Sequence, residues 1–269
     1  MQGRVLIIAG SDPSGGAGVQ ADIKTVTALG GYAAACITSL TVQNTKGVTG
    51  VHGVAPEIIR AQIIAVLEDI GADAIKIGMI GEPAAGIAIA DTLVDFASAI
   101  PIVLDPVLVA TSGDALAADG MPALLLERLA PLAAIVTPNA QEAERLTGIS
   151  VKSTDDLVAA GTALIQRGAT AALVKGAHLQ GDTIEDALVT LDGARIFRNP
   201  RIDTTSTHGT GCTLASAVAT GIAQGLPLAA AVKRAIDYVQ EAIRTAPGFG
   251  GGHGPLNHAW PITRLLQRD

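Results

Sequence analysis

Six short runs of β-branched and other apolar residues recur along the chain, separated by stretches with helical spacing. The runs lie at 4–10, 34–40, 74–79, 100–107, 132–139 and 170–176. Each run is almost continuously apolar, which is typical of strands buried on both faces of a parallel sheet. Helical patterns lie at 17–29, 56–70, 84–98, 121–130, 140–147, 155–167, 212–224 and 228–245. The alternation predicts an α/β fold whose mostly parallel central sheet has helices on both faces.

One segment departs from this alternation. Residues 185–200 carry two strand-like runs around Asp192-Gly193, a dipeptide that favours a tight hairpin turn, so we expect an antiparallel pair there. The glycine-rich stretch at 247–258 is interpreted as a loop, and no linker, repeat or low-complexity block divides the 269 residues. We therefore expect a single domain over residues 1–269.

Composition narrows the classes of partner. The chain has a formal net charge of −7, no basic run and only 2% aromatic residues, which argues against nucleic acid or an anionic membrane surface. No segment reaches the roughly 18 apolar residues of a membrane-spanning helix. The N-terminal apolar run is too short for a signal peptide, and Cys36 and Cys212 form no CxxC motif. We expect a cytoplasmic protein that acts on a small molecule.

Seven polar residues and one methionine lie at the carboxyl ends of the expected strands. In chain order these residues are Ser11, Asp12, Gln43, Asn44, Met79, Asp105, Asn139 and Lys175. In open parallel sheets, ligands bind at this edge. Strand ends are often polar simply because loops are polar. A lysine directly after “AALV” and an aspartate that closes “PIVL” indicate function more strongly than that.

The segment “GSDPSGGAGVQAD” (10–22) contains a GxGxxA match. A dinucleotide site is the first interpretation, but “SDPS” separates the strand from the glycines, whereas dinucleotide-binding glycines turn the chain directly into the helix. A flexible loop is the second interpretation. We favour a third, a substrate loop in which glycines permit close approach and Asp12 and Asp22 accept hydrogen bonds.

The segment “TPNAQEAERL” (137–146) has two interpretations. Asn139 precedes a helix and Glu142 follows three residues later, which is close to a capping box. The same two side chains also suit a Mg²⁺–phosphate site, because Mg²⁺ keeps several waters and needs few protein carboxylates. Capping is the better interpretation of this segment alone. Asp105 and Lys175, expected at the same sheet edge, favour the metal interpretation.

The segment “THGTGCT” (207–213) has the features of an anion cradle. Glycines flank Thr210 before a helix, and a helix N-terminus favours negative charge. Cys212 follows in the first helical turn, where the thiol pKa is expected to be lowered, although a small buried side chain is the simpler alternative. The histidines show no metal-ligand spacing with either cysteine. His208 either orients the cradle or has a purely structural role.

Seven motifs, in order along nearly the whole chain, resemble those of the hydroxymethylpyrimidine/phosphomethylpyrimidine kinases, a branch of the ribokinase-like superfamily. They are “GSDPSGGAGVQAD”, “TVQNT” (41–45), “KIGM” (76–79), “NAQEAERL” (139–146), “VKGAH” (174–178), “THGTGCT” and “GHGPLNH” (252–258). The resemblance implies a ribokinase-like fold and a homodimer. It also implies ATP and Mg²⁺ as cofactors for phosphorylating 4-amino-5-hydroxymethyl-2-methylpyrimidine, first to the monophosphate and then to the diphosphate.

The resemblance also implies roles for individual residues. Gln43 would hydrogen-bond the aminopyrimidine. The same pocket would be lined by Gly10, Asp22, Met79 and Val107. Asn139 and Glu142 would serve Mg²⁺ and phosphate with Asp105 nearby, and Lys175 would contact the ATP phosphates. The anion hole would consist of Gly209, Thr210 and Gly211.

Cys212 stands where many ribokinase-like sugar kinases have an aspartate, the base for the attacking alcohol. A partly ionised thiol is expected to suffice, because positioning and charge stabilisation dominate phosphoryl transfer. In the second phosphorylation the nucleophile is itself a phosphate and needs no base. We hypothesise that a permanent carboxylate would repel this phosphate, whereas a mostly neutral thiol would not.

Two other functions stay open at this point. A pyridoxal kinase shares the fold, and diphosphate formation with the pyrimidine alone would distinguish the two enzymes. A non-catalytic pyrimidine-binding regulator would have a degraded phosphate site. The retention of Asn139, Glu142, Lys175 and the glycines of the cradle argues against a regulator.

Overall fold

One sheet organises the computed structural model, which describes residues 2–109, 113–114, 116, 118–177 and 179–266. Within these ranges its nine strands have the spatial order β3-β2-β1-β4-β5-β6-β7-β8-β9. The strands are β1 (Arg4–Ser11), β2 (Tyr32–Asn44), β3 (Gly47–Gly53), β4 (Ala74–Ile77), β5 (Ile102–Leu104), β6 (Ile135–Val136), β7 (Ala172–Lys175), β8 (Thr183–Thr190) and β9 (Gly193–Pro200). Neighbours from β2 to β7 pair in parallel, which confirms the mostly parallel sheet.

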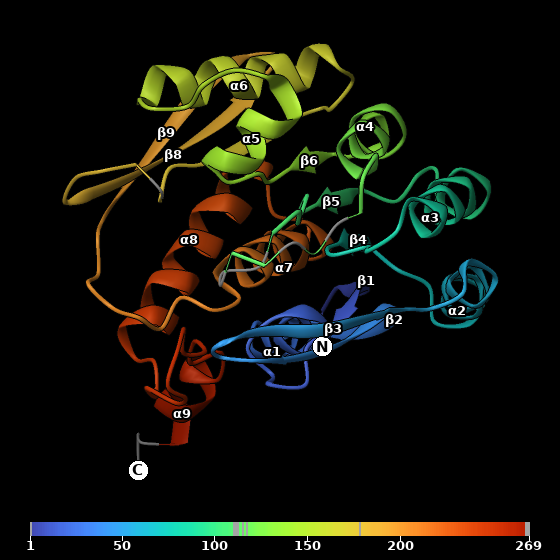
Figure 1. The fold of residues 1–269 in the computed structure, drawn as a ribbon, viewed down its shortest axis with the longest axis horizontal. Helices are drawn as coiled ribbons and strands as arrows, with labels where there is room; N and C mark the ends of the chain where they lie inside the picture. The colour runs from blue at the N-terminus through green and yellow to red at the C-terminus, as the bar shows by residue number, and fades with distance from the viewer. Residues whose placement is uncertain (1, 110–112, 115, 117, 178, 267–269) are drawn as a thin grey trace.

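Helices cover both faces of this sheet (Figure 1). The helices are α1 (Gly18–Ala28), α2 (Pro56–Asp69), α3 (Pro83–Phe96), α4 (Met121–Leu124), α5 (Ala140–Thr147), α6 (Thr154–Gln166), α7 (Thr210–Ala223), α8 (Leu228–Arg244) and α9 (Trp260–Leu266). Buried residues of α1, α7 and α8 belong to one hydrophobic cluster, and those of α2 to α6 belong to the other. The predicted layering is therefore confirmed.

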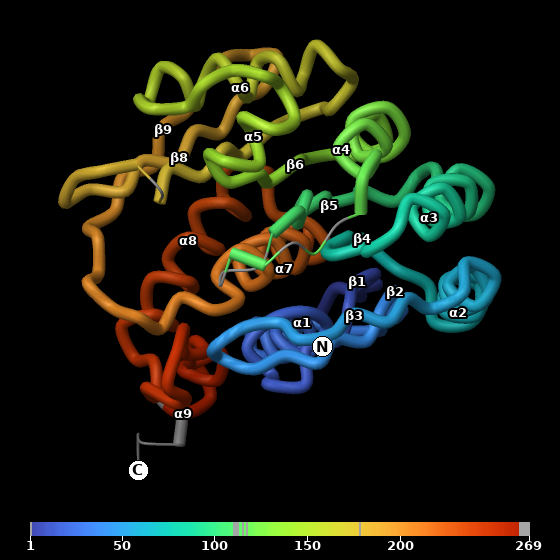
Figure 2. The backbone as a smooth tube through the Cα atoms, viewed as in Figure 1, coloured from blue at the N-terminus to red at the C-terminus, as the bar shows by residue number. Residues whose placement is uncertain are grey.

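Antiparallel hairpins form both edges of the sheet. The β8–β9 pair confirms the predicted hairpin, but Thr190 pairs with Gly193, so the turn is Leu191-Asp192, one residue before the predicted Asp192-Gly193. The β2–β3 pair was not predicted: the expected strand at 34–40 is part of the longer β2, so Gln43 lies inside a hairpin. Figure 2 shows the tip of this hairpin beside the C-terminal segment, where His253 N–H donates to the Thr45 carbonyl at 2.8 Å.

Several elements differ in length or type from their prediction. β5 and β6 are short, because Pro101, Pro106 and Pro138 in the predicted runs have no N–H for ladder hydrogen bonds. The helix expected at 121–130 changes after α4 into a π-helix over Leu125–Leu129. α9 was not predicted at all. These differences leave the strand order and the two helical layers unchanged.

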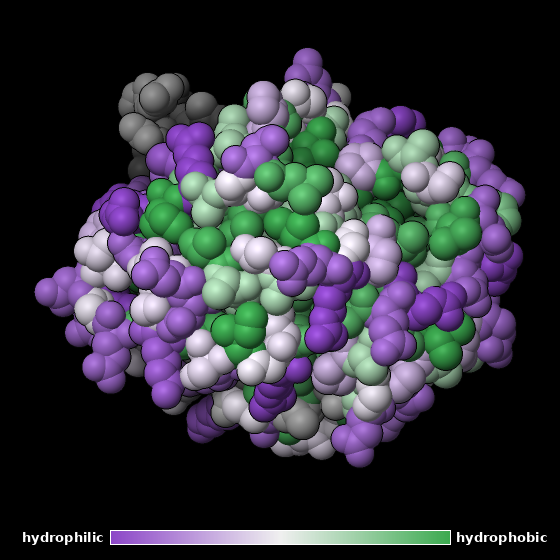
Figure 3. Space-filling view, turned by 90° about the horizontal axis from the view of Figure 1, so that it is seen from above, coloured by the Kyte–Doolittle hydropathy of each residue, from purple (hydrophilic) through white to green (hydrophobic). Residues whose placement is uncertain are grey.

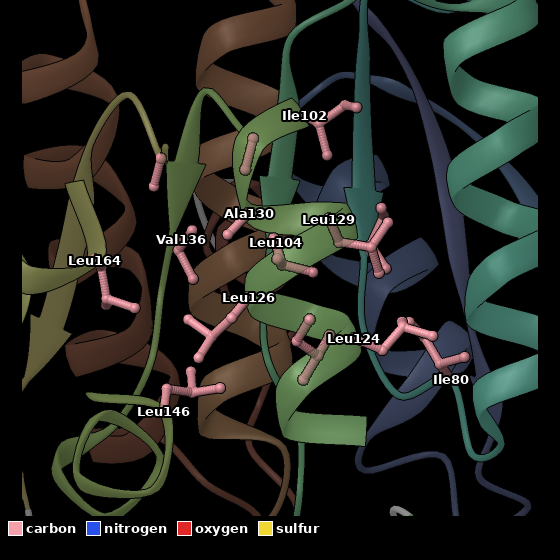
Figure 4. Close-up of a cluster of buried hydrophobic side chains, with 14 of the residues drawn as sticks. Ile80, Ile102, Leu104, Leu124, Leu126, Leu129, Ala130, Val136, Leu146 and Leu164 are labelled. Atoms are coloured by element: carbon pink, nitrogen blue, oxygen red, sulfur yellow. The ribbon is translucent and has the colours of Figure 1, made fainter. Parts of the chain in front are cut away.

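The core lies on both sides of the sheet because successive strand residues point to opposite faces. In β1, Leu6 and Ile8 belong to one cluster, whereas Val5 and Ile7 belong to the other. Figure 4 shows part of the first cluster, with Leu104 and Val136 of the sheet beside Leu126 and Leu129 of the helical layer. Each fully buried side chain of this size stabilises the fold by ~1.5–3 kcal/mol.

The outer surface mixes side-chain types. On the face carrying α4 and α6, hydrophilic and hydrophobic residues lie interspersed (Figure 3). No helix in the described part of the chain is long and apolar enough to cross a membrane.

A fully buried charged pair crosses the α1/α7 side of the interior. Lys76 Nζ, on β4, lies 2.8 Å from Asp22 Oδ2 on α1, and neither side chain has exposed surface. The Ser216 hydroxyl on α7 donates to the other Asp22 oxygen at 2.7 Å. Burial lowers the pKa of Lys76, but the charges of Asp22, Cys212 and Asp105 together with the Asp22 hydrogen bond raise it above its ordinary value. The ammonium thus stays charged and joins three elements.

We predict that Lys76→Met destabilises the protein by about 3–5 kcal/mol, because it leaves the Asp22 carboxylate buried without its partner. The double variant Lys76→Met/Asp22→Asn should recover a large part of this loss. Urea unfolding measures both values. Lys233→Met is the control, because it breaks an exposed pair with Asp237 and should cost less than about 1 kcal/mol. A single Lys76→Met variant as stable as the wild type would contradict the prediction.

Candidate active site

Charged side chains meet at the carboxyl edge of the parallel strands. Lys175 Nζ, at the end of β7, lies 3.2 Å from Asp105 Oδ1, which directly follows β5. The Thr137 hydroxyl, just after β6, donates to the same oxygen at 3.1 Å. A Cβ atom on Gly211 would lie 3.2 Å from Lys175 Nζ and 3.6 Å from Asp105 Oδ2. The edge therefore brings a lysine and a carboxylate to the first turn of α7.

Asn139 and Glu142 form a reciprocal capping box at the start of α5. Asn139 Oδ1 accepts from the Glu142 N–H at 2.9 Å, and Glu142 Oε2 accepts from the Asn139 N–H at 2.8 Å. Burial and the charge of Asp105 raise the pKa of Glu142 to about 7, although the charge of Lys175 opposes them. The capping interpretation is confirmed. Glu142 also lies within the electrostatic reach of both Asp105 and Lys175.

These side chains are a small donor set for a metal ion. No group of three or more histidine, cysteine, aspartate or glutamate residues that could hold a metal occurs among the described residues. Mg²⁺ typically takes one or two protein carboxylates and completes its shell with water and phosphate oxygens. Asp105 and Glu142, two buried carboxylates that face one lysine, fit that requirement.

The glycine segment forms the N-terminus of α7. Gly209 is the N-cap in the left-handed region, with φ +81°. The Gly211 and Cys212 amides follow in the first turn, where an α-helix provides no acceptors for its N–H groups. Thr210 differs from its expected role, because its N–H and hydroxyl both donate to the Thr207 carbonyl, at 3.3 and 2.7 Å. Thr210 therefore shapes the cradle, and the amides of its two successors are the available donors.

The expectation of a lowered pKa at Cys212 is wrong. Burial raises the pKa of this thiol to about 11, and the charges of Asp22 and Asp105 act in the same direction. Lys76 and a hydrogen bond from the Gly18 N–H lower the pKa, but by less. Desolvation, together with two nearby carboxylates, thus determines the direction of the shift. At neutral pH the thiol is protonated.

Lys76 is the site residue that sequence reasoning did not identify. It lies within the apolar run “AIKIGM”, where its neighbours indicate a buried strand. Its charge acts on the Cys212 thiol, so it lies within the site’s electrostatic field. A lone lysine in an otherwise buried strand was the available signal, because burying an ammonium requires a partner.

Three of the expected substrate residues lie near the ends of neighbouring strands: Gly10 on β1, Gln43 on β2 and Met79 just after β4. The Gly10 N–H donates to the Met79 carbonyl at 3.1 Å, and a Cβ atom on Gly10 would lie 3.2 Å from Met79 Sδ. Gln43 is half-buried on β2, where its Oε1 accepts from the Thr41 hydroxyl at 3.1 Å. That hydroxyl also donates to the Ser11 carbonyl, at the end of β1. Gln43 therefore lies near the end of the strand that carries Gly10.

Val107 and Asp22 complete the expected set. Val107 is half-buried just beyond β5, and its N–H donates to the Asp105 carbonyl at 2.8 Å. Asp22 differs from its expected position on the pocket wall. It has no exposed surface, and both carboxylate oxygens accept from Lys76 and Ser216. Asp22 thus lies behind the pocket. His178, at the end of the motif “VKGAH”, lies outside the described residues.

Comparison with known proteins identifies the family. The model of the phosphomethylpyrimidine kinase family matches residues 12–257. A hydroxymethylpyrimidine/phosphomethylpyrimidine kinase of Rhizobium meliloti is 47% identical over 94% of this chain and 96% of its own length. The thiamine biosynthesis bifunctional protein ThiED of Geobacter sulfurreducens is 48% identical over 96% of this chain, which spans only 52% of that longer protein.

Solved structures agree with this match. The phosphomethylpyrimidine kinase of Clostridium difficile is 40% identical, with a TM-score of 0.79 over 89% of this chain and 99% of that chain. The pyridoxal kinase of Bacillus subtilis, solved as an ADP complex, is 31% identical, with a TM-score of 0.88 over 98% of this chain and 100% of that chain. With a family model that matches most of its length and relatives above 40% identity, the chain belongs to the phosphomethylpyrimidine kinase family.

Proposed function

We propose that this protein uses ATP to phosphorylate 4-amino-5-hydroxymethyl-2-methylpyrimidine to its monophosphate and then to the diphosphate, for thiamine biosynthesis. The observation that carries the proposal is the buried Lys175–Asp105 pair beside the glycine cradle of α7. A cation and helix N-terminal amides at one point suit a phosphoryl group that gathers charge during transfer. The names of the Rhizobium and Clostridium relatives support the choice of substrate.

Each polar group of the site has a role in this reaction. Lys175 would bind ATP phosphates, and the Gly211 and Cys212 amides would stabilise charge on the transferred group. Asp105 and Glu142 would hold Mg²⁺, with Asn139 fixing the Glu142 side chain through the capping box. When bound, Mg²⁺ neutralises charge on the phosphates and aligns them. Because the transition state is loose, alignment and charge contribute more than deprotonation of the alcohol.

The pyrimidine would lie between the β2–β3 hairpin and Cys212. The carboxamide of Gln43 can both donate and accept, which matches adjacent edges of an aminopyrimidine. Met79 and Val107 would provide the apolar wall, and Gly10 has no side chain because Ser39 and Met79 pack directly against its backbone. Asp22 would act from behind the pocket, by holding the Lys76 ammonium in place.

A protonated Cys212 suits a protein that carries out both phosphorylations. With a pKa of about 11, the thiol is uncharged when the monophosphate enters as the second nucleophile. An aspartate at this position would place a negative charge beside another negative charge. The thiol is too weakly ionised to act as the main base for the first step, so its role is to leave the site neutral.

Pyridoxal kinase is the second candidate, because pyridoxal kinase structures superpose on the chain with TM-scores up to 0.88. A coupled ATP assay with each alcohol, followed by mass analysis of the products, distinguishes the candidates. We expect mono- and diphosphate from the pyrimidine and little product from pyridoxal. Turnover of pyridoxal alone would reject the proposed function.

We further propose that residues 1–269 act as one kinase domain, as a cytoplasmic homodimer. The single sheet that includes all nine described strands supports one domain. The free thiols of Cys36 and Cys212 support a reducing compartment. Leu40 and Val42, which are 52% and 54% exposed on the β2–β3 hairpin, support a surface that a second copy covers. Sedimentation analysis measures the assembly directly.

We predict that Gln43→Ala raises the KM for the pyrimidine roughly tenfold, because one or two hydrogen bonds of about 1 kcal/mol each are lost. The KM for ATP should stay within about twofold of wild type, since no shared contact changes. Thr49→Ala, on the same hairpin, is the control for disturbance of the hairpin itself. An unchanged pyrimidine KM in Gln43→Ala would remove this residue from the pocket.

We predict that Lys175→Met lowers kcat/KM for ATP at least about 100-fold, because a point charge on the phosphates is lost. Glu142→Gln keeps an acceptor for the Asn139 N–H, so α5 stays capped while the Mg²⁺ requirement moves to higher concentration. Steady-state rates over a Mg²⁺ titration measure both effects. Lys152→Met, at an exposed position, is the matched control. Wild-type ATP and Mg²⁺ curves in both site variants would place the phosphates elsewhere.

We predict that Cys212→Asp slows the second phosphorylation at least about tenfold more than the first, because it adds a fixed charge beside the incoming monophosphate. Cys212→Ser, which stays neutral, should affect the two steps about equally. The steps are measured separately, starting from the alcohol and from the monophosphate. Equal losses in Cys212→Asp would show that charge at this position does not govern the second step.

A further inference from the structure

The Asp12 carboxylate, directly after β1, is saturated with hydrogen bonds although it is almost fully buried. It accepts from the Ser14 N–H and hydroxyl at 2.9 and 2.8 Å and from the Ala17 N–H at 2.8 Å. His208 Nε2 lies 2.7 Å from Asp12 Oδ2. Burial alone would raise the pKa of Asp12, but these hydrogen bonds and the charge of His208 hold it below its ordinary value. Asp12 is therefore a carboxylate that organises the loop at 12–17.

His208 connects this loop to a distant part of the chain. It is 4% exposed and directly precedes Gly209, the N-cap of α7. For Nε2 to bond to a carboxylate, that nitrogen must carry the proton. The backbone N–H of His208 also donates to the Gly254 carbonyl at 3.1 Å. The imidazole is therefore held from both its ring and its backbone.

The loop and the cradle touch through their backbones as well. A Cβ atom on Gly209 would collide with the Gly16 carbonyl oxygen, and a Cβ atom on Gly16 would collide with the His208 ring. The contact surfaces therefore admit no side chain, and the Asp12–His208 hydrogen bond links the loop and the cradle across them. The acceptors of Asp12 are taken by Ser14, Ala17 and His208, so Asp12 is not the substrate acceptor that the sequence suggests, and the proposed function gives neither residue a role in direct binding.

We propose that Asp12 and His208 are positioning residues that fix the 12–17 loop, and with it the alcohol, relative to the phosphate cradle. The proposal rests on the proposed function, because it concerns alcohol and phosphoryl group together. Gly10 precedes the loop and Gly18 follows it, and the Gly18 N–H bonds to the Cys212 thiol. A loop held at His208 thus sets the pocket on one side of Cys212 and the cradle on the other.

The size of the effect follows from the geometry of transfer. The attacking oxygen and the phosphorus must be aligned within a fraction of an ångström, and a misplacement of 1 Å typically costs about 100-fold in rate. Loss of the link should therefore lower kcat and leave the separate affinities for ATP and pyrimidine nearly unchanged. A merely structural role would instead lower stability without this division between kcat and KM.

The test uses His208→Ala, His208→Gln and Asp12→Asn in the full chain. Glutamine carries an N–H donor at about the reach of Nε2, so His208→Gln should restore the bond that His208→Ala removes. We expect His208→Ala and Asp12→Asn each to lower kcat about 10- to 100-fold, with both KM values within about threefold of wild type. His208→Gln should recover at least about a third of the wild-type kcat. The double variant Asp12→Asn/His208→Ala should be no slower than the slower of its two single variants.

Hydrogen exchange provides a readout that needs no substrate. The Ser14 and Ala17 amides donate to Asp12, so their exchange should accelerate in His208→Ala and return toward wild type in His208→Gln. His52→Ala, an exposed histidine on β3, is the control. Wild-type kcat in His208→Ala, multiplicative losses in the double variant, or unchanged exchange would each overturn the proposal. If the wild-type protein phosphorylated no pyrimidine alcohol, the proposed function would fail, whereas the exchange result would still decide whether His208 holds the loop.

Discussion

A lysine ammonium buried among apolar strands is the constraint on which the site depends. Lys76 has no exposed surface, so its charge requires a partner, and Asp22 on α1 and Ser216 on α7 complete that arrangement. A buried ion pair contributes little net stability compared with apolar packing, but only one arrangement of its elements satisfies it. Here that arrangement places the N-termini of α1 and α7 on the same side of β4. The glycine loop and the anion cradle are the segments at those two N-termini.

The balance of charges at the site is local, and it differs from the negative net charge of the whole chain. A chain with net charge −7 repels polyanions at long range. At the sheet edge, however, Lys175 faces the buried carboxylates Asp105 and Glu142 beside the α7 amides, while Lys76 and Asp22 pair behind the pocket. Acidic and basic groups thus nearly balance within the site. The protonated thiol of Cys212 adds no further charge.

Those parts of the fold and of the site that a single local rule determines could be predicted from the sequence. Nearly continuous apolar runs indicated the parallel strands, and polar residues directly after them indicated Asp105 and Lys175, which the structure joins. The prediction failed where a property depends on contacts between segments that are far apart in the chain. A helix N-terminus lowers a thiol pKa in isolation, but at Cys212 burial raises it, and the carboxylates of Asp22 on α1 and Asp105 after β5 act in the same direction. Lys76 and Asp22 are 54 residues apart, and their pairing has no local signature. Strand β3 is half exposed, so a search for continuous apolar runs does not find it.

The backbone contact between Gly16 and Gly209 has a consequence for how such a site can vary over time. The Gly16 carbonyl oxygen occupies the space that a methyl group on Gly209 would need, and the His208 ring occupies the space that one on Gly16 would need. Gly209 also has a positive φ, which other residues adopt only with strain. Neither position can therefore be explored in small steps, because even alanine separates the loop from the cradle. Substrate preference therefore has to diverge through side chains that face the ligand, while the two glycines of this junction stay unchanged.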